Sequence, residues 1–81
     1  MSNFLIFANT YRENLKRLLA EKPESFAFPA SEANIVADKM IVAFDKGTYN
    51  KDGLAIIATC KALKIKHTYK AINEYINIKA P

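Results

Sequence analysis

The sequence predicts an all-α fold, a compact bundle of about four helices, from three observations. Apolar residues recur at helical spacing through most of the chain. Only 2 glycines and 3 prolines occur, which is too few for the turns between many short strands. With 81 residues, 51% of them hydrophobic and 25% charged, the chain has the length and composition of one globular domain, predicted over residues 1–81.

The first helix is predicted over residues 3–21, where one stripe collects Phe4, Phe7, Ala8, Tyr11, Leu15, Leu18 and Leu19. On the other side, Glu13 and Arg17 are four residues apart, in the order that favours an ion pair. Pro23 ends the helix, because the residue before a proline avoids helical geometry. We expect the stripe to serve the core and also a dimer surface.

An extended connection is expected between Pro23 and Pro29. Phe26 and Phe28 alternate there with small residues, and we expect one or both to fill the core. A short edge strand is the alternative, although no second strand is evident to pair with it.

The second helix is predicted over residues 31–46. Ser31 is a suitable N-cap, and Glu32 in the first turn suits the helix dipole. Gly47 fits the left-handed position just past the helix end. The expected buried stripe is Ala33, Val36, Ala37, Met40, Ile41 and Phe44.

Residues 52–77 are predicted to form a basic hairpin of two helices. For the third helix, about 52–63, Asn50 or Asp52 can act as the cap, and the expected inner face is Leu54, Ile57, Ala58, Ala62 and Leu63. The fourth helix is expected to start at His67 or Thr68 and end near 77, with an inner face of Tyr69, Ile72, Tyr75 and Ile76.

The net charge of +4 lies entirely in residues 51–81, the part of the chain that contains this hairpin. Residues 1–50 hold equal numbers of basic and acidic groups, whereas residues 51–81 hold six lysines against Asp52 and Glu74. Such an asymmetry indicates an anionic partner, either nucleic acid or an acidic protein surface.

The stretch 54–76 resembles in part the helix-turn-helix of bacterial and phage repressors. Cys60, Leu63 and Ile65 match the small and apolar positions of the first half. Lys64 stands where the motif carries glycine, which predicts a side chain in a left-handed position.

The second half of the motif matches less well. Five and eight residues after Ile65, where apolar residues are expected, stand Lys70 and Asn73; the apolar Ile72 and Tyr75 come two residues later. Either the turn is longer by about two residues, or this is an ordinary helical hairpin without a DNA role.

More widely, the stretch "YNKDGLAIIATCKALKIKHTYKAINEYI" resembles small helical proteins of bacterial phages and mobile elements, a group to which no established activity attaches. Such small proteins are commonly regulators, or inhibitors that block a host complex by binding it. The resemblance therefore implies one of these two roles.

The predicted site for nucleic acid or another anionic partner consists of Lys51, Lys61, Lys64, Lys66, His67, Thr68, Lys70 and Asn73. Lysines near the turn suit phosphate oxygens, and Lys70 and Asn73 are expected on the outward face of the last helix, where a groove-reading helix contacts bases. The alternative is a solvated lysine-rich face. No arginine follows Arg17, so any DNA binding should be mainly electrostatic and salt-sensitive.

The tyrosines are further candidates for stacking on bases or for anchoring a protein: Tyr11, Tyr49, Tyr69 and Tyr75. Tyr49 lies in a polar loop and would be a partner contact if exposed. Partial burial against the bundle is the other interpretation.

An enzyme is not expected, nor a metal or cofactor. Cys60 and His67 are the only residues of their types, and there is no acid pair, glycine-rich phosphate loop or nucleophile motif. A lone cysteine indicates a reducing compartment, and the apolar run Phe4–Ala8 is too short for a signal peptide or a membrane span. We expect a cytoplasmic protein without membrane contact.

Two functional hypotheses follow. The first is a small non-enzymatic DNA-binding regulator, acting as a homodimer, whose C-terminal hairpin contacts phosphates. The second is a protein-binding inhibitor or adaptor of a phage or mobile element, for example an anti-CRISPR or other anti-defence protein, that occupies an acidic host surface.

Overall fold

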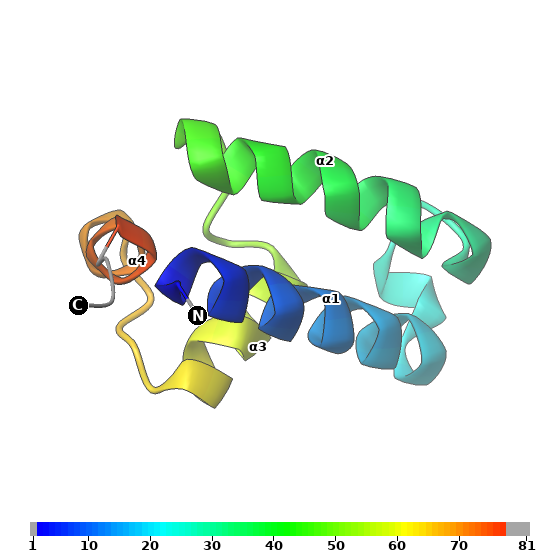
Figure 1. Cartoon of the computed structure of the whole chain (residues 1–81). Coiled ribbons are helices and arrows are strands. Elements are labelled where there is room, and N and C mark those ends of the chain that lie inside the picture. Colours follow the sequence, from blue (N-terminus) through cyan, green and yellow to red (C-terminus); the bar gives the residue numbers. More distant parts are fainter. Residues whose placement is uncertain (1, 78–81) are drawn as a thin grey trace.

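The computed structural model describes residues 2–77, and within them the all-α prediction is confirmed, since no strand is present. The four α-helices, shown in Figure 1, are α1 (Asn3–Glu21), α2 (Ala33–Lys46), α3 (Leu54–Leu63) and α4 (Tyr69–Asn77). Two single-turn 3₁₀ helices, η1 (Pro23–Ser25) and η2 (Ala30–Glu32), lie between α1 and α2.

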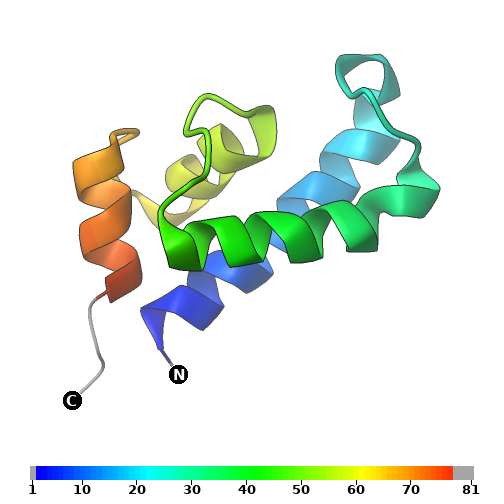
Figure 2. The ribbon, with the colours of Figure 1, turned by 90° about the horizontal axis from the view of Figure 1, so that it is seen from above.

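The first helix, α1, is the element on which the other three helices pack. It begins after Ser2, whose hydroxyl caps it by accepting a hydrogen bond from the Leu5 amide at 3.2 Å. Figures 1 and 2 show α2 and α3 on two sides of α1, with α4 beside its N-terminal end. The helix bounds match the prediction, because the apolar period of the sequence is long and Pro23 follows.

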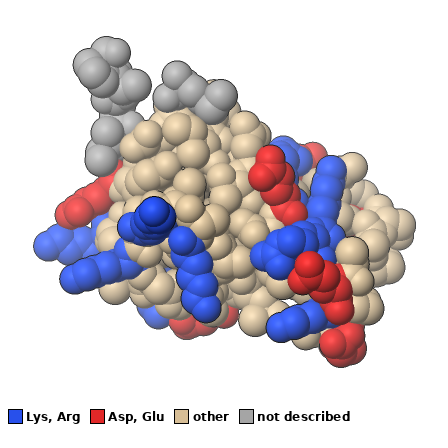
Figure 3. All heavy atoms as spheres, turned by 90° about the horizontal axis from the view of Figure 1, so that it is seen from below, with Lys and Arg blue, Asp and Glu red and all other residues tan. Residues whose placement is uncertain are grey.

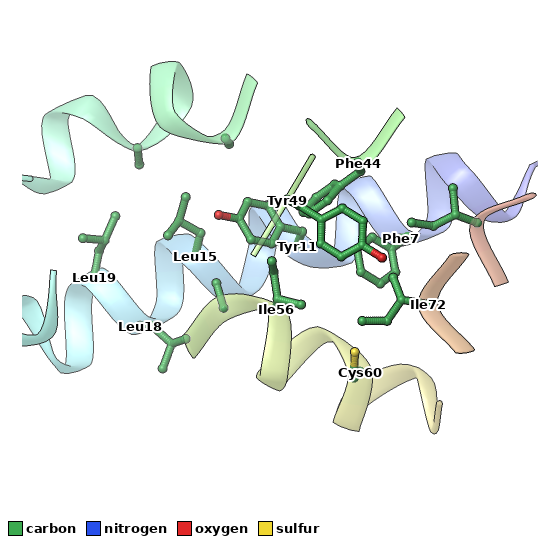
Figure 4. Packing of buried hydrophobic residues seen from close by; sticks show 14 residues of the cluster. Phe7, Tyr11, Leu15, Leu18, Leu19, Phe44, Tyr49, Ile56, Cys60 and Ile72 are labelled. Atoms are coloured by element: carbon green, nitrogen blue, oxygen red, sulfur yellow. The ribbon is translucent and has the colours of Figure 1, made fainter. Parts of the chain in front are cut away.

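Aromatic rings fill the centre of the core (Figure 4). Phe7 is 0% exposed and meets the ring of Phe44 edge-on, with 5.0 Å between centroids. Phe44 in turn contacts Tyr11 at 5.0 Å and Tyr49 at 5.4 Å, both in edge-on geometry. Each such pair contributes about 0.5–1.5 kcal/mol beyond its buried area. The core therefore joins α1, the end of α2 and the loop that follows α2.

The apolar stripe of α1 is used within the chain. Phe7, Tyr11 and Leu15 are all at most 4% exposed, and Leu18 and Leu19 are buried beside them. These side chains are therefore covered by the other helices and are not free to form a dimer surface, while homodimerisation itself stays a prediction.

The connection before α2 agrees with the prediction at its two phenylalanines and differs from it at the helix cap. Phe26 and Phe28 are half-buried at the edge of the core and pack on each other, with ring centroids 5.6 Å apart, and neither lies in a strand. Ser31 is not an N-cap, because it lies inside η2, and α2 begins at Ala33 without a side-chain cap. The 3₁₀ turn already directs the chain into the helix.

The buried face of α3 also differs from the prediction. The buried residues are Ala55, Ile56, Thr59 and Cys60, whereas Leu54 is 46% exposed and Ala62 is exposed. Because α3 is apolar on nearly every side, its periodicity does not select a face. Thr59 is tolerated in the core because its hydroxyl donates to the Ala55 carbonyl at 2.6 Å.

Charged side chains make different pairs from those expected on α1. Arg17 pairs with Glu21 at 3.1 Å instead of with Glu13. A second arginine, Arg12, reaches Asp38 on α2 at 2.6 Å and links the two helices at the surface. Exposed pairs of this kind contribute about 0–1 kcal/mol each, so the helix contacts depend on the apolar core.

Two helix ends use the left-handed conformation, as predicted. Gly47 follows α2 with a φ of 73°, and Lys64 follows α3 with a φ of 58°. The Ile65 amide donates to the Cys60 carbonyl at 3.0 Å, which completes a Schellman-type end at Lys64. Of these two sites, only position 47 has glycine, the residue that this conformation prefers.

Substitutions at Gly47 and Lys64 should change the stability of the protein in opposite directions. Gly47→Ala should lower the free energy of unfolding by about 1 kcal/mol through backbone strain alone, since a Cβ there meets no atom within 4 Å. Lys64→Gly should raise it by about 0.5–1 kcal/mol, because the strain of a side chain is relieved. Urea unfolding measures both, and changes of the same sign would contradict this account.

Candidate nucleic-acid interface

Four lysines of the predicted site are exposed at the end of the molecule formed by α3 and α4. They are Lys61 in α3, Lys64 and Lys66 in the turn, and Lys70 in α4, and together we call them the lysine surface. None of them forms an ion pair with a carboxylate of residues 2–77. Figure 3 shows mainly basic side chains over this end, with acidic groups at its edge, whereas acidic and basic groups alternate at the other end.

The turn at Lys64 fixes part of this surface. Its amide donates to the Lys61 carbonyl at 3.3 Å, and the adjacent Ile65 is half-buried against the core. The backbone between Lys61 and Lys64 is therefore held in place, although the side chains of these two lysines are free to move. Two cations on a fixed backbone suit neighbouring phosphates along a strand.

His67 and Thr68 have structural roles in this turn. The Nε2 atom of His67 is hydrogen-bonded to the Lys51 carbonyl, which can only accept, so this nitrogen carries the proton. The Thr68 hydroxyl caps α4 by accepting from the Ala71 amide at 3.1 Å. The structure therefore brings both predicted residues beside the lysine surface, but the Nε2 atom of His67 and the hydroxyl of Thr68 already have partners.

Lys51 is also close to this end, and its charge is partly neutralised. Its ammonium group lies 2.9 Å from the carboxylate of Asp52. This hydrogen bond raises the pKa of Lys51 and lowers the pKa of Asp52. Both groups remain charged at neutral pH, so Lys51 presents less net positive charge than the four lysines of the lysine surface.

Tyr49 and Asn73 are hydrogen-bonded to each other inside the molecule's C-terminal end. Tyr49 is 5% exposed, and its hydroxyl donates to Asn73 Oδ1 at 2.6 Å. Burial raises the pKa of this phenol. The buried interpretation of Tyr49 is therefore the correct one, and the expectation that Asn73 lies on the outward face of the last helix is wrong.

The outward face of α4 follows from the residues that it buries. Ile72 and Ile76 point into the core, and Tyr69, predicted to be inward, is 44% exposed. The outward positions are then taken by Lys70 and Glu74, which are exposed and four residues apart. An acidic group thus stands next to the single lysine on this helix.

The link between α3 and α4 bears on the motif resemblance. It runs from Lys64 to Thr68, which is longer than the turn of about three or four residues in a helix-turn-helix. Both helices pack mainly on α1, and contacts between them are sparse. A link of this length fits both alternatives, a helix-turn-helix with a longer turn and an ordinary helical hairpin, so a recognition-helix role for α4 stays a prediction.

In residues 2–77, the side chains that could react or bind a metal do not cluster at one site. Cys60 is 1% exposed, and burial raises the pKa of its thiol. Among residues 2–77, no three His, Cys, Asp or Glu side chains are grouped so that they could hold a metal ion. Within the same residues, no helix combines the length and the apolar character needed to cross a membrane.

A contact that the sequence did not predict links the loop 48–53 to α4. The Lys51 amide donates to the Tyr69 hydroxyl at 3.3 Å, and the Tyr69 ring packs on Tyr49 with 5.4 Å between centroids. The partners are 18 and 20 residues apart in the sequence, so helical periodicity carries no signal for them. The loop and α4 form one unit, which positions the end of the molecule that bears the lysine surface.

The Tyr49–Asn73 hydrogen bond should be measurable as a coupling energy. Tyr49→Phe leaves Asn73 Oδ1 without its donor and should lower the free energy of unfolding by about 1 kcal/mol. In a double-mutant cycle with Asn73→Ala, the two losses should not add, because both remove the same bond. Tyr75→Phe, which alters a half-buried phenol outside this contact, is the control. Strictly additive losses would show that the bond contributes nothing.

Comparisons with known proteins do not identify the chain: no protein-family model, no curated protein and no solved structure matches it. Its function is therefore inferred from the geometry and charge of the lysine surface.

Proposed function

We propose that this protein is a small non-enzymatic nucleic-acid-binding regulator that contacts phosphates through its lysine surface. The observation that carries the proposal is the gathering of Lys61, Lys64, Lys66 and Lys70 at one end, all exposed and without an ion pair in residues 2–77. Lysines in this state attract the phosphate backbone and release its counterions on binding.

The composition of this surface favours binding that is weakly dependent on sequence. Bidentate contacts to guanine prefer arginine, and no arginine occurs after Arg17. Asn73, whose amide could have paired with adenine, is engaged by Tyr49. Phosphate contacts without base-edge contacts position a protein on nucleic acid but carry no direct sequence information.

A second candidate is the protein-binding inhibitor or adaptor, and the outer face of α2 favours it. Ile35 and Val42 are 59% and 52% exposed and lie seven residues apart, so they point to the same side of the helix. Exposed apolar side chains at this spacing suit a groove or helix of a protein partner. On this alternative, the lysine surface meets acidic groups of the same partner.

Changing the four lysines to alanine should remove most nucleic-acid binding. With about four phosphate contacts, affinity for a DNA duplex should fall about a hundredfold between 50 and 200 mM salt. In the variant with all four changed, affinity at about 50 mM salt should fall by at least tenfold and the salt dependence should be nearly lost. Fluorescence anisotropy with labelled DNA measures both.

A matched control removes the same charge from elsewhere on the surface. Lys16, Lys22, Lys39 and Lys46 are also exposed and lie outside the lysine surface. Changing either set of four leaves the chain, whose net charge is +4, formally neutral. Equal losses from both sets would show that total charge, and not the lysine surface, governs binding. No binding to nucleic acid by the unchanged protein would refute the proposal and favour the protein-binding candidate.

A further inference from the structure

We infer that the nucleic acid recognised here is single-stranded, and that Tyr69 stacks on one of its bases. This inference rests on the proposed function and adds to it the class of target and a residue that distinguishes that class. The lysine surface can bind only phosphates, whereas an aromatic side chain beside it can stack on an unpaired base.

Tyr69 is the tyrosine whose ring is available. It is 44% exposed, whereas Tyr11 and Tyr49 are at most 5% exposed, and Tyr75 is half-buried against Phe7. Tyr69 lies in the first turn of α4, three residues before the buried Ile72, and could itself have been buried. Its exposure therefore calls for an explanation, and stacking on a base supplies one.

Two lysines flank Tyr69 in the sequence, and a third lies close to its ring in space. Lys66 and Lys70 are exposed three residues before it and one residue after it. Lys51 comes from the other side, with its ammonium nitrogen 5.8 Å from the ring centroid. A base on the ring would therefore have phosphates within reach of cations from two segments of the chain.

The ring is also held in place before any ligand binds. Its hydroxyl accepts a hydrogen bond from the Lys51 amide, and the ring packs on the buried ring of Tyr49, 5.4 Å away and tilted by 56°. An immobilised ring loses little conformational freedom on stacking, which favours binding. The long side chain of Lys51 can leave the ring and follow a phosphate.

The same end of the molecule is poorly suited to a duplex groove. The outward face of α4 carries the exposed Glu74 four residues after Lys70, and an acidic group there repels the phosphates that flank a groove. Asn73 accepts a hydrogen bond from Tyr49 with its Oδ1 atom, so its amide is not free for a bidentate contact with adenine. In a duplex the bases are stacked on each other, so Tyr69 gains a partner only from an unpaired strand.

Tryptophan fluorescence can test this inference, because the protein contains no tryptophan of its own. Tyr69→Trp and the control Ile35→Trp, at a position 59% exposed on α2, each carry one tryptophan. Each is titrated with a twelve-residue thymidine oligonucleotide, its uridine RNA equivalent and a duplex of the same length. Circular dichroism and melting curves establish that both variants are folded.

Stacking should quench the tryptophan at position 69 with at least one of the two single strands, and the control should change little. Tyr69→Leu should weaken single-strand binding about 5- to 100-fold, while Tyr69→Phe, which keeps the ring, should stay within about threefold of the unchanged protein. The affinity for the duplex should change less than threefold in both variants, Tyr69→Leu and Tyr69→Phe.

Two results would overturn the inference, and they are distinguishable. Lysine-dependent duplex binding with no quenching by either single strand, or equal losses for Tyr69→Leu and Tyr69→Phe, would refute stacking and leave the proposed function standing. Absence of binding to all three oligonucleotides would refute both.

Discussion

The apolar stripe of α1 is the constraint on which the rest of the structure depends. Phe7, Tyr11 and Leu15 are buried along one side of this helix, and α2, α3 and α4 all pack on it. Contacts between α3 and α4 are sparse, so these two helices are placed mainly by their separate contacts with α1. In a chain this short, one central helix lets three shorter helices share a single core.

The polarity of the surface follows from this arrangement. The loop 48–53 and α4 close the core at the N-terminal end of α1, where Tyr49 contacts Phe44, Tyr69 and Asn73. The polar atoms of His67 and Thr68 hold the turn before α4. What remains outside is the lysine surface, with the Tyr69 ring beside it. The same contacts that stabilise this end thus decide which side chains a partner can reach.

Much of the fold could be predicted from local pattern, and the exceptions have physical reasons. The bounds of α1 and the left-handed ends at Gly47 and Lys64 agree with the sequence, because spacing, Pro23 and helix-end chemistry are local signals. The inner face of α3 could not be predicted, since that helix is apolar on nearly every side. For the candidate site, exposure of the four turn and helix lysines was predictable from their charge. The inward position of Asn73 was not, because its partner Tyr49 is 24 residues away.

The central claim is that packing on α1 gathers the surplus positive charge into one anion-binding surface. Nuclear magnetic resonance of the ¹⁵N-labelled protein, titrated with a short thymidine oligonucleotide at low salt, tests it most directly. The account predicts that the amide shifts that change fall in residues 61–70 and the loop 48–53, while those of α2 and the C-terminal half of α1 stay in place. Changes centred on α2, or spread evenly over the molecule, would contradict it.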